Sequence, residues 1–284
     1  MVTYYFAKLN INEKILEKDS FDNIKNVLIP TFLLNEASPF KEEQTPYIEK
    51  KNNKVTKKIK SIAWKFTDTE RVNDKIIKGK ITRIVTSRDL DFADLKNSRT
   101  VVREHEHLDA VNFFYNSDSE LFAYRSTTEI PYGGTPNKIE NIFKHNDADG
   151  LIGEIKVMLL TKTDEISSRI TKGVIKKFQV DLIIPNERHT TDSIADVLSD
   201  NGIKNGRLTG ENNEGIISTN EKGELTGLMK EVVDLMALGY AKASFWLSEN
   251  SKTKKRTKVT SQTIAKKKNM KGLNDKEINN LFKD

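Results

Sequence analysis

The sequence predicts an α+β protein: two domains built on mostly antiparallel sheets, followed by a basic C-terminal extension. Three observations support this prediction. Segments in which apolar and polar residues alternate, as they do in strands, occur through most of the chain, with a few amphipathic segments typical of helices between them. The polar run His145–Gly150 interrupts this pattern near the middle of the chain. Residues 250–284 are rich in lysine and poor in apolar side chains.

The composition excludes several classes of protein. The 284 residues suffice for two domains of ordinary size, and the formal net charge is +6. Without any cysteine, the chain has no disulfide, thiolate metal ligand or cysteine nucleophile. No apolar run approaches the roughly 18–20 residues that cross a bilayer, and Met1–Leu9 lacks the pattern of a signal peptide. We therefore expect a cytoplasmic protein without membrane contact and without a cofactor.

The first domain is predicted to cover residues 1–148. A partial helix is expected within residues 12–28, and a short helix begins at Thr135–Pro136, because proline fits the first helical position. Residues 36–58, with two prolines and many lysines, are expected to be a loop or hairpin tip that contains the basic segment 50–60. Alternation predicts strands over residues 3–11, 62–66 and 79–86 and a hairpin over residues 111–125.

The second domain is predicted to cover residues 151–249. Strands are expected at 152–160, 176–185 and 240–247, with a weak hairpin within 203–223. A capped helix is expected around Ile194–Leu198 and an amphipathic helix over Leu225–Leu238, ended by Gly239. This order of strands and helices predicts a small sandwich with a ferredoxin-like arrangement.

Two basic segments carry the main functional signal. Residues 252–271 contain nine lysine and arginine residues and no carboxylate, and residues 50–60 form a second basic cluster. Closely spaced cations without intervening carboxylates favour binding to phosphates through release of counterions. Solvated charge that only keeps the protein soluble is the alternative. The candidate nucleic-acid-binding residues are Lys50, Lys51, Lys54, Lys57, Lys58, Lys252, Lys254, Lys255, Arg256, Lys258, Lys266, Lys267 and Lys268.

The segment Arg103–Asp109 is the one candidate for a catalytic or metal site. On a strand, His105, His107 and Asp109 project to the same side, as the ligands of a metal do. Such an alternation of charged residues is equally typical of the exposed face of a strand, and one strand alone does not enclose a metal. We therefore assign no catalytic residue and no metal ligand, and a metal-dependent nuclease stays an alternative.

Weaker features have simpler structural readings. The aromatic residues Phe113, Tyr115 and Tyr124 of the hairpin stack on bases if that face is open, and belong to the core if it is not. Gly133–Pro136 combines a turn with a helix cap, and also has the composition of an anion site at a helix start.

The order of elements in the second half resembles a known group of proteins. The chain resembles RexA-type phage-exclusion proteins and related phage-defence families. The resemblance is carried by Asn112–Tyr115, Leu121–Arg125, the short helix after Pro136, the strand Lys176–Pro185 and the late helix. The likeness covers about residues 105–250 and rests on element order more than on residue identity. It implies a dimeric DNA-binding protein that takes part in defence against phage, and it supplies no catalytic residues.

Together these observations predict a homodimer that binds DNA without sequence preference, with double-stranded DNA favoured, as a sensor or regulator in phage defence. The metal-dependent nuclease and an interaction module that binds a phage protein or a defence-system protein are the alternatives.

Overall fold

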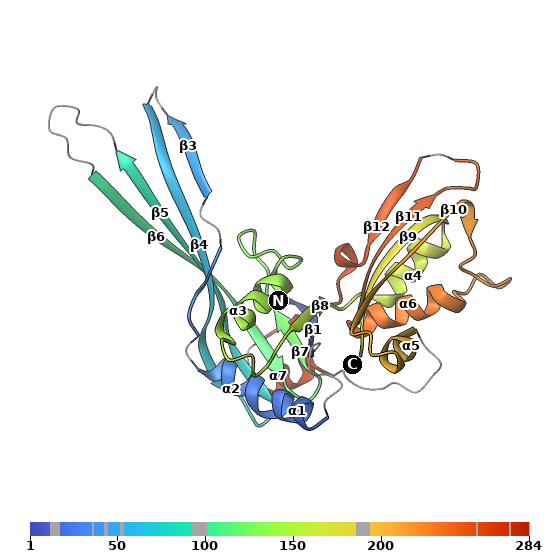
Figure 1. The fold of residues 1–284 in the computed structure, drawn as a ribbon, viewed down its shortest axis with the longest axis horizontal. Coiled ribbons are helices and arrows are strands. Elements are labelled where there is room, and N and C mark those ends of the chain that lie inside the picture. Colours follow the sequence, from blue (N-terminus) through green and yellow to red (C-terminus); the bar gives the residue numbers. More distant parts are fainter. Residues whose placement is uncertain are drawn as a thin grey trace.

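The structure, a computed structural model, describes residues 1–11, 18–35, 37–42, 45–51, 54–91, 101–185, 194–253, 255–272 and 274–283. It contains two antiparallel sheets with helices packed against them, which confirms the predicted α+β class (Figure 1). Among the described residues, no helix is both long enough and apolar enough to cross a membrane.

The larger sheet has nine strands in the order β13–β1–β7–β6–β5–β4–β2, with β3 added to β4 and β8 added to β1. It combines the predicted N-terminal strands with two segments from later in the chain. Its strands are β1 (Val2–Ile11), β2 (Phe40–Lys41), β3 (Thr45–Lys51), β4 (Lys54–Arg71), β5 (Ile76–Asp91), β6 (Val101–Asn116), β7 (Leu121–Tyr124), β8 (Ile155–Leu159) and β13 (Lys267–Met270).

Helices cover both faces of this sheet around β1. On one face lie α1 (Lys18–Asn23), the π-helical turn η1 (Ile24–Leu28), α2 (Ile29–Leu34) and α3 (Thr135–Asn146), whose apolar side chains join one core. On the other face, α7 (Asp275–Leu281) packs on a second cluster that includes Tyr4 and Phe6. Since β1 is covered on both sides, every residue from Phe6 to Ile11 is buried.

Three long strands carry the larger sheet far beyond its core. β4, β5 and β6 have 18, 16 and 16 residues, and β3 pairs with the outer half of β4 from Lys60 to Lys54. Their outer halves project from the body as a twisted arm (Figure 1). The segment expected as a loop or hairpin tip is therefore, in its described residues, the hairpin β3–β4 of this arm.

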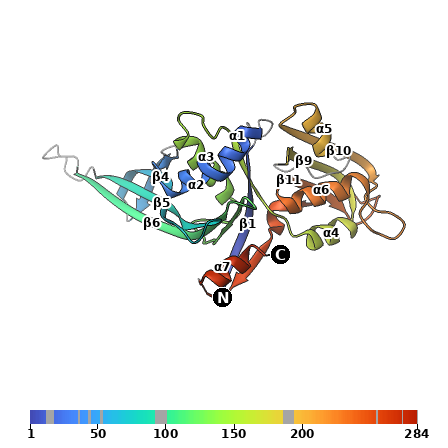
Figure 2. The same cartoon turned by 90° about the horizontal axis from the view of Figure 1, so that it is seen from below.

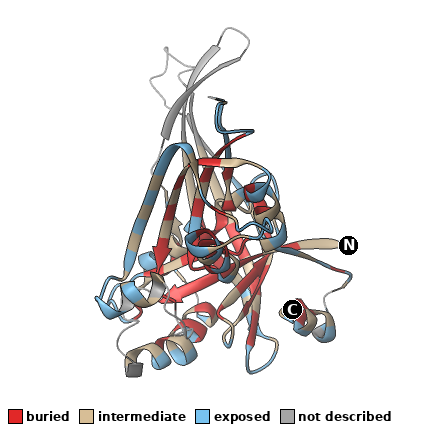
Figure 3. Cartoon of the chain, turned by 90° about the vertical axis from the view of Figure 1, so that its right-hand side faces the viewer, coloured by how far each residue is buried: buried red, intermediate tan, exposed pale blue. Residues whose placement is uncertain are grey.

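The smaller sheet has four strands in the order β10–β9–β11–β12. Helices α4 (Thr163–Thr171) and α6 (Gly227–Leu238) lie side by side against it (Figure 2), and α5 (Ile194–Asp200) contacts α6. The strands are β9 (Val174–Ile183), β10 (Asn205–Ile216), β11 (Ala241–Ser248) and β12 (Thr257–Thr260). Buried residues gather where the helices meet the sheets (Figure 3).

The expected ferredoxin-like order is wrong. Its first strand, predicted at 152–160, is β8, which pairs with β1 of the larger sheet through a register that joins Ala7 to Leu159. In the smaller sheet β9 and β10 are antiparallel neighbours joined through α5, and β10 is one strand where a weak hairpin was expected. The apolar alternation of residues 155–159 fits a strand of either sheet, so the sequence pattern alone leaves its partner open.

The expected basic extension is also wrong, because its described residues are folded. β12 pairs with β11 and β13 pairs with the start of β1. Between them Ser261–Ile264 form a short 3₁₀ turn, η2. Met270, Ile278 and Leu281 are buried. These three apolar residues are widely spaced among lysines and asparagines. The average composition of the segment therefore did not indicate that it contributes to the core.

Candidate nucleic-acid interface

The first group of candidate lysines lies on the arm. Lys50 and Lys51 are on β3 and Lys54, Lys57 and Lys58 are on β4, in a hairpin whose register sets Lys51 opposite Lys54. The side chains of these five residues lie outside the described part of the structure. The backbone alone therefore places this cluster, at the outer end of the projecting strands.

The second group does not stay together. Lys252, Lys255, Arg256 and Lys258 lie beside or on β12 of the smaller sheet, whereas Lys266, Lys267 and Lys268 lie at β13 of the larger sheet. Lys268 donates hydrogen bonds to the carbonyl oxygens of Asn280, at 2.9 Å, and Lys283, so its ammonium group holds the end of α7. Lys254 lies outside the described residues. Folding thus splits the described residues of the basic segment 252–271 between two surfaces.

One face of the smaller sheet is open. Phe178, Val180 and Leu182 of β9 and Ala243 and Phe245 of β11 point toward α4 and α6 and are buried. Because side chains alternate along a strand, their neighbours point to the opposite face. This open face carries Lys177, Gln179 and Asp181 from β9, Lys242, Ser244 and Trp246 from β11, Arg207, Thr209 and Glu211 from β10, and Lys258 and Thr260 from β12.

Trp246 lies at the centre of a cationic group on the open face. It stands directly opposite Lys177 in the β9 ladder and directly opposite Lys258 in the β12 ladder. The ammonium groups lie 5.7 Å (Lys177) and 5.1 Å (Lys258) from the centroid of the indole. Both distances are within the range of cation–π attraction.

Carboxylates gather on one side of the open face. Glu211 of β10 accepts a hydrogen bond from Arg256 at 2.8 Å and lies 3.6 Å from Lys177. The Arg256 hydrogen bond and then the charge of Lys177 lower the pKa of Glu211. Asp181 pairs with Arg207 at 2.6 Å. On the β11–β12 side, Lys242 and Lys258 are exposed and form no salt bridge within the described residues.

The open face ends in a hollow against the larger sheet. This hollow, of about 210 Å³, is lined by Asp181, Lys242 and Gln262 on one side and by residues of α3 and β8, including Asn137 and Glu140, on the other. Glu140 accepts a hydrogen bond from the backbone N–H of Val157 at 2.6 Å. Burial raises the pKa of Glu140 despite that bond.

The segment Arg103–Asp109 forms part of β6, on the strand expected from its pattern. His105 and His107 are exposed. Both oxygens of the Asp109 carboxylate are engaged, one by Arg83 at 2.8 Å and one by His107 at 2.9 Å. Within the described ranges no three histidine or carboxylate side chains gather as a metal site requires.

The aromatic residues of the hairpin β6–β7 belong to the core. Phe113, Tyr115 and Tyr124 are each 0% exposed, and Phe113 and Tyr115 contact the ring of Phe122. The Tyr124 hydroxyl donates to the backbone oxygen of Tyr132 at 2.8 Å. Stacking of these rings on bases is therefore excluded.

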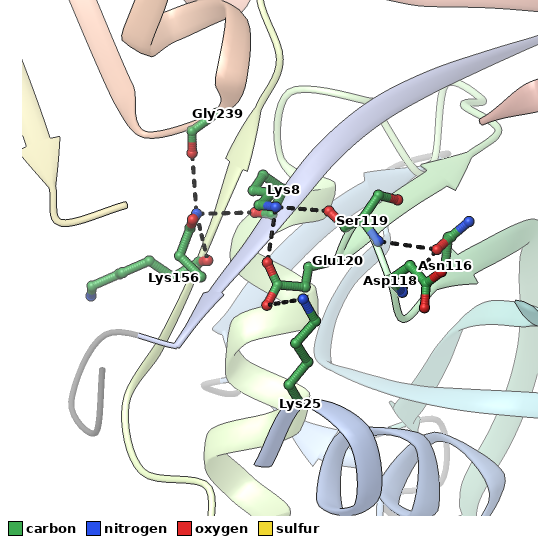
Figure 4. A network of polar contacts seen from close by, with 9 residues as sticks. Lys8, Lys25, Asn116, Asp118, Ser119, Glu120, Lys156 and Gly239 are labelled. Atoms are coloured by element: carbon green, nitrogen blue, oxygen red, sulfur yellow. Dashed lines mark hydrogen bonds and ion pairs between the residues drawn. The ribbon is translucent and has the colours of Figure 1, made fainter. Parts of the chain in front are cut away.

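A buried network of charged and amide side chains lies around β1, next to the end of α6, and holds the fold together. Lys8 and Lys25 converge on the carboxylate of Glu120 (Figure 4). Asn10, on the same strand as Lys8, donates to the carbonyl oxygens of Lys156 and Gly239, at 3.3 and 3.1 Å. Because Gly239 ends α6, this amide joins the helices of the smaller sheet to the centre of the larger one.

The open face was not predicted from the sequence, although one residue, Trp246, indicates it. Strands were predicted at 176–185 and 240–247, and no binding role was assigned to the polar residues within them. A tryptophan in such a polar position, as Trp246 is, marks an exposed aromatic ring. The registry that sets Trp246 between Lys177 and Lys258 depends on strand pairing that no local pattern gives.

Comparison with known proteins gives a family but no function. A family model described as a domain of unknown function (DUF4747) matches residues 3–283. No curated protein matches the chain.

Proposed function

The chain belongs to the DUF4747 family, whose description assigns no function, and we propose that it binds nucleic acid through contacts to the phosphate backbone. The observation that carries this proposal is the open face of the smaller sheet. Five cations that are far apart in the sequence gather there or at its edge: Lys177, Arg207, Lys242, Arg256 and Lys258.

The charge of this face suits a polyanion. Two carboxylates, Glu211 and Asp181, oppose the five cations, and both are already paired with arginine. Lys242 and Lys258 are exposed and form no salt bridge within the described residues, and the ammonium group of Lys258 lies 5.1 Å from the indole centroid of Trp246. Lysines that approach phosphates displace condensed counterions, which favours binding at low salt without reading the base sequence.

The lysines of the hairpin β3–β4 extend the same proposal. A β-ribbon is narrow enough to enter the major groove of DNA, and this ribbon belongs to the arm that projects from the body (Figure 1). We propose that the arm makes a second set of backbone contacts, to duplex DNA.

A proposal for the cellular role is supported by the resemblance to RexA-type proteins. On that basis we propose that the protein acts as a homodimer in defence against phage, as a sensor or regulator that binds DNA. Light scattering on the purified protein tests the dimer: a mass of one chain at micromolar concentration contradicts it.

Fluorescence polarisation with labelled oligonucleotides tests the binding. We compare the wild type with Lys242→Gln/Lys258→Gln, and with the control Lys172→Gln/Lys230→Gln, which removes two exposed lysines from the helix-covered side. We expect the open-face variant to bind about tenfold or more weakly and the control to bind like the wild type. No binding at low salt by the wild type, or equal losses in both variants, contradicts the proposal.

A further inference from the structure

Trp246 occupies an unusual place for a tryptophan. Its ring lies on the face of β11 that none of the described helices covers, and its side chain is partly exposed between two lysines. The other tryptophan, Trp64, is 4% exposed and its indole N–H donates to Glu42 at 2.9 Å. The packing of the sheet does not need the indole of Trp246, because the core of this unit lies on the opposite face.

The surroundings of Trp246 match the chemistry of an unpaired nucleotide. An aromatic ring stacks on any base, and cations beside it attract the phosphates that link successive bases. In a duplex the bases are stacked on one another and hidden from a flat sheet, whereas a single strand turns its bases outward. A ring held on an open sheet between two ammonium groups therefore favours a single strand.

We propose, on the premise that the protein binds nucleic acid, that Trp246 stacks on a base of a single-stranded DNA or RNA ligand. Lys177 and Lys258 move from the indole to the neighbouring phosphates as the base takes its place on the ring. Both lysines lie directly opposite Trp246 in their ladders, so each reaches the ring and the backbone on either side of it.

The distribution of charge gives the strand a path along β11. On the β9–β10 side Asp181 and Glu211 already engage Arg207 and Arg256, whereas on the β11–β12 side Lys242 and Lys258 form no salt bridge within the described residues. Lys242 is four residues before Trp246 on the same face, roughly 13 Å away along the strand. At this end lies the hollow lined by Lys242, by the amides of Asn137 and Gln262 and by the carboxylates of Asp181 and Glu140, and amides are groups that donate to and accept from base edges.

Intrinsic tryptophan emission tests the stacking directly. Since Trp64 is buried, a base that stacks on Trp246 quenches the emission of the accessible indole only. We titrate the wild-type protein with an unlabelled single-stranded oligonucleotide of mixed sequence, in DNA and RNA form, and with the DNA duplex of the same sequence. We expect quenching by the single strands and little by the duplex.

Two substitutions of Trp246 test whether its aromatic ring contributes to binding while the neighbouring charges stay in place. By fluorescence polarisation, we expect Trp246→Leu to bind the single strand about tenfold or more weakly, and Trp246→Phe, which keeps an aromatic ring, to stay within about threefold of the wild type. Thermal melting of both variants checks that they fold.

The outcomes distinguish this inference from the proposed function. Wild-type protein that binds the single strand without any change in emission, together with an unaffected Trp246→Leu variant, overturns the stacking but leaves binding to the backbone standing. Equal quenching by duplex and single strand overturns the choice of a single strand. Absence of binding to every oligonucleotide overturns both.

Discussion

Lys8 and Glu120 form an ion pair of 2.9 Å in which the Glu120 side chain is 0% exposed. A second lysine, Lys25, lies 3.6 Å from the same carboxylate. Glu120 has a left-handed backbone, with φ at 56°, at the end of the turn between β6 and β7, and its carbonyl oxygen accepts a hydrogen bond from Leu9 at 2.8 Å. The pair therefore fixes the hairpin against the central strand β1.

The first prediction concerns this pair. We expect Glu120→Gln to destabilise the protein by about 3–5 kcal/mol, because it leaves the buried ammonium group of Lys8 without its counter-charge. The control is Asp118→Asn in the same turn, whose partner Lys75 is exposed, and for which we expect a much smaller loss of stability because water screens a surface pair. Chemical denaturation measures both free energies of unfolding. Equal values for the two variants would mean that the buried pair contributes no more than a surface pair.

Gly239 supports a second prediction, on the contact between the two units. It ends α6 with φ at 79°, and a Cβ atom there would lie 2.5 Å from the Cβ of Lys8. We expect Gly239→Ala to lower the melting temperature clearly, through both the left-handed backbone and the clash. Gly223→Ala is the matched control, because Gly223 has φ at 77° and nothing within 4 Å of an added Cβ. If both variants melt alike, the clash with Lys8 has no energetic effect.

The folded C-terminal segment gives a third prediction. We expect Leu281→Ala to destabilise the protein by about 2–5 kcal/mol, since its side chain, on the last residue of α7, is buried in the cluster that includes Tyr4 and Phe6. We expect removal of residues 250–284 to abolish the cooperative melting transition, because it takes β13 from β1 and β12 from β11. Calorimetry measures both. A truncated protein that melts cooperatively at the wild-type temperature would show that the segment is dispensable for the fold.

Glu140 supports a fourth prediction, on pH. Burial raises its pKa above the ordinary value of 4.5, so folding favours the protonated form. The stability that this group contributes is present at acidic pH and is lost as the pH rises through the raised pKa. We expect Glu140→Gln, which does not titrate, to gain stability relative to the wild type as the pH rises from the ordinary pKa of 4.5 through the raised pKa of Glu140. A difference that stays constant over this range would contradict the account of Glu140.

Much of the fold could be predicted from the sequence, because local patterns determine it. Alternation identified β1, β9 and β11, and Gly239 correctly marked the end of α6, where its left-handed conformation is required. The polar turn Asn116–Glu120 marked the hairpin β6–β7, and the side chain of Asn116 accepts hydrogen bonds from the backbone of Asp118 and Ser119.

Long-range pairing could not be predicted in the same way. Residues 155–159 alternate like any strand, and only their register with β1 places them in the larger sheet. Residues 267–270 are two lysines, an asparagine and a methionine, so their pairing with Val2–Tyr5 left no alternating apolar signal. The candidate interface could not be predicted for the same reason. Trp246, Lys177 and Lys258 are not adjacent in the sequence and come together only through the pairing of β11 with β9 and β12.

The dependence of single-strand affinity on salt tests the central claim, that the open face binds nucleic acid through its lysines, most directly. We measure the dissociation constant of one oligonucleotide at several salt concentrations for the wild type and for Lys177→Gln/Lys258→Gln. Each phosphate contact adds about 0.7 to the slope of log affinity against log salt for a single strand. We predict a slope shallower by about 1.4 in the double variant. An unchanged slope, or wild-type binding that does not depend on salt, would contradict the claim.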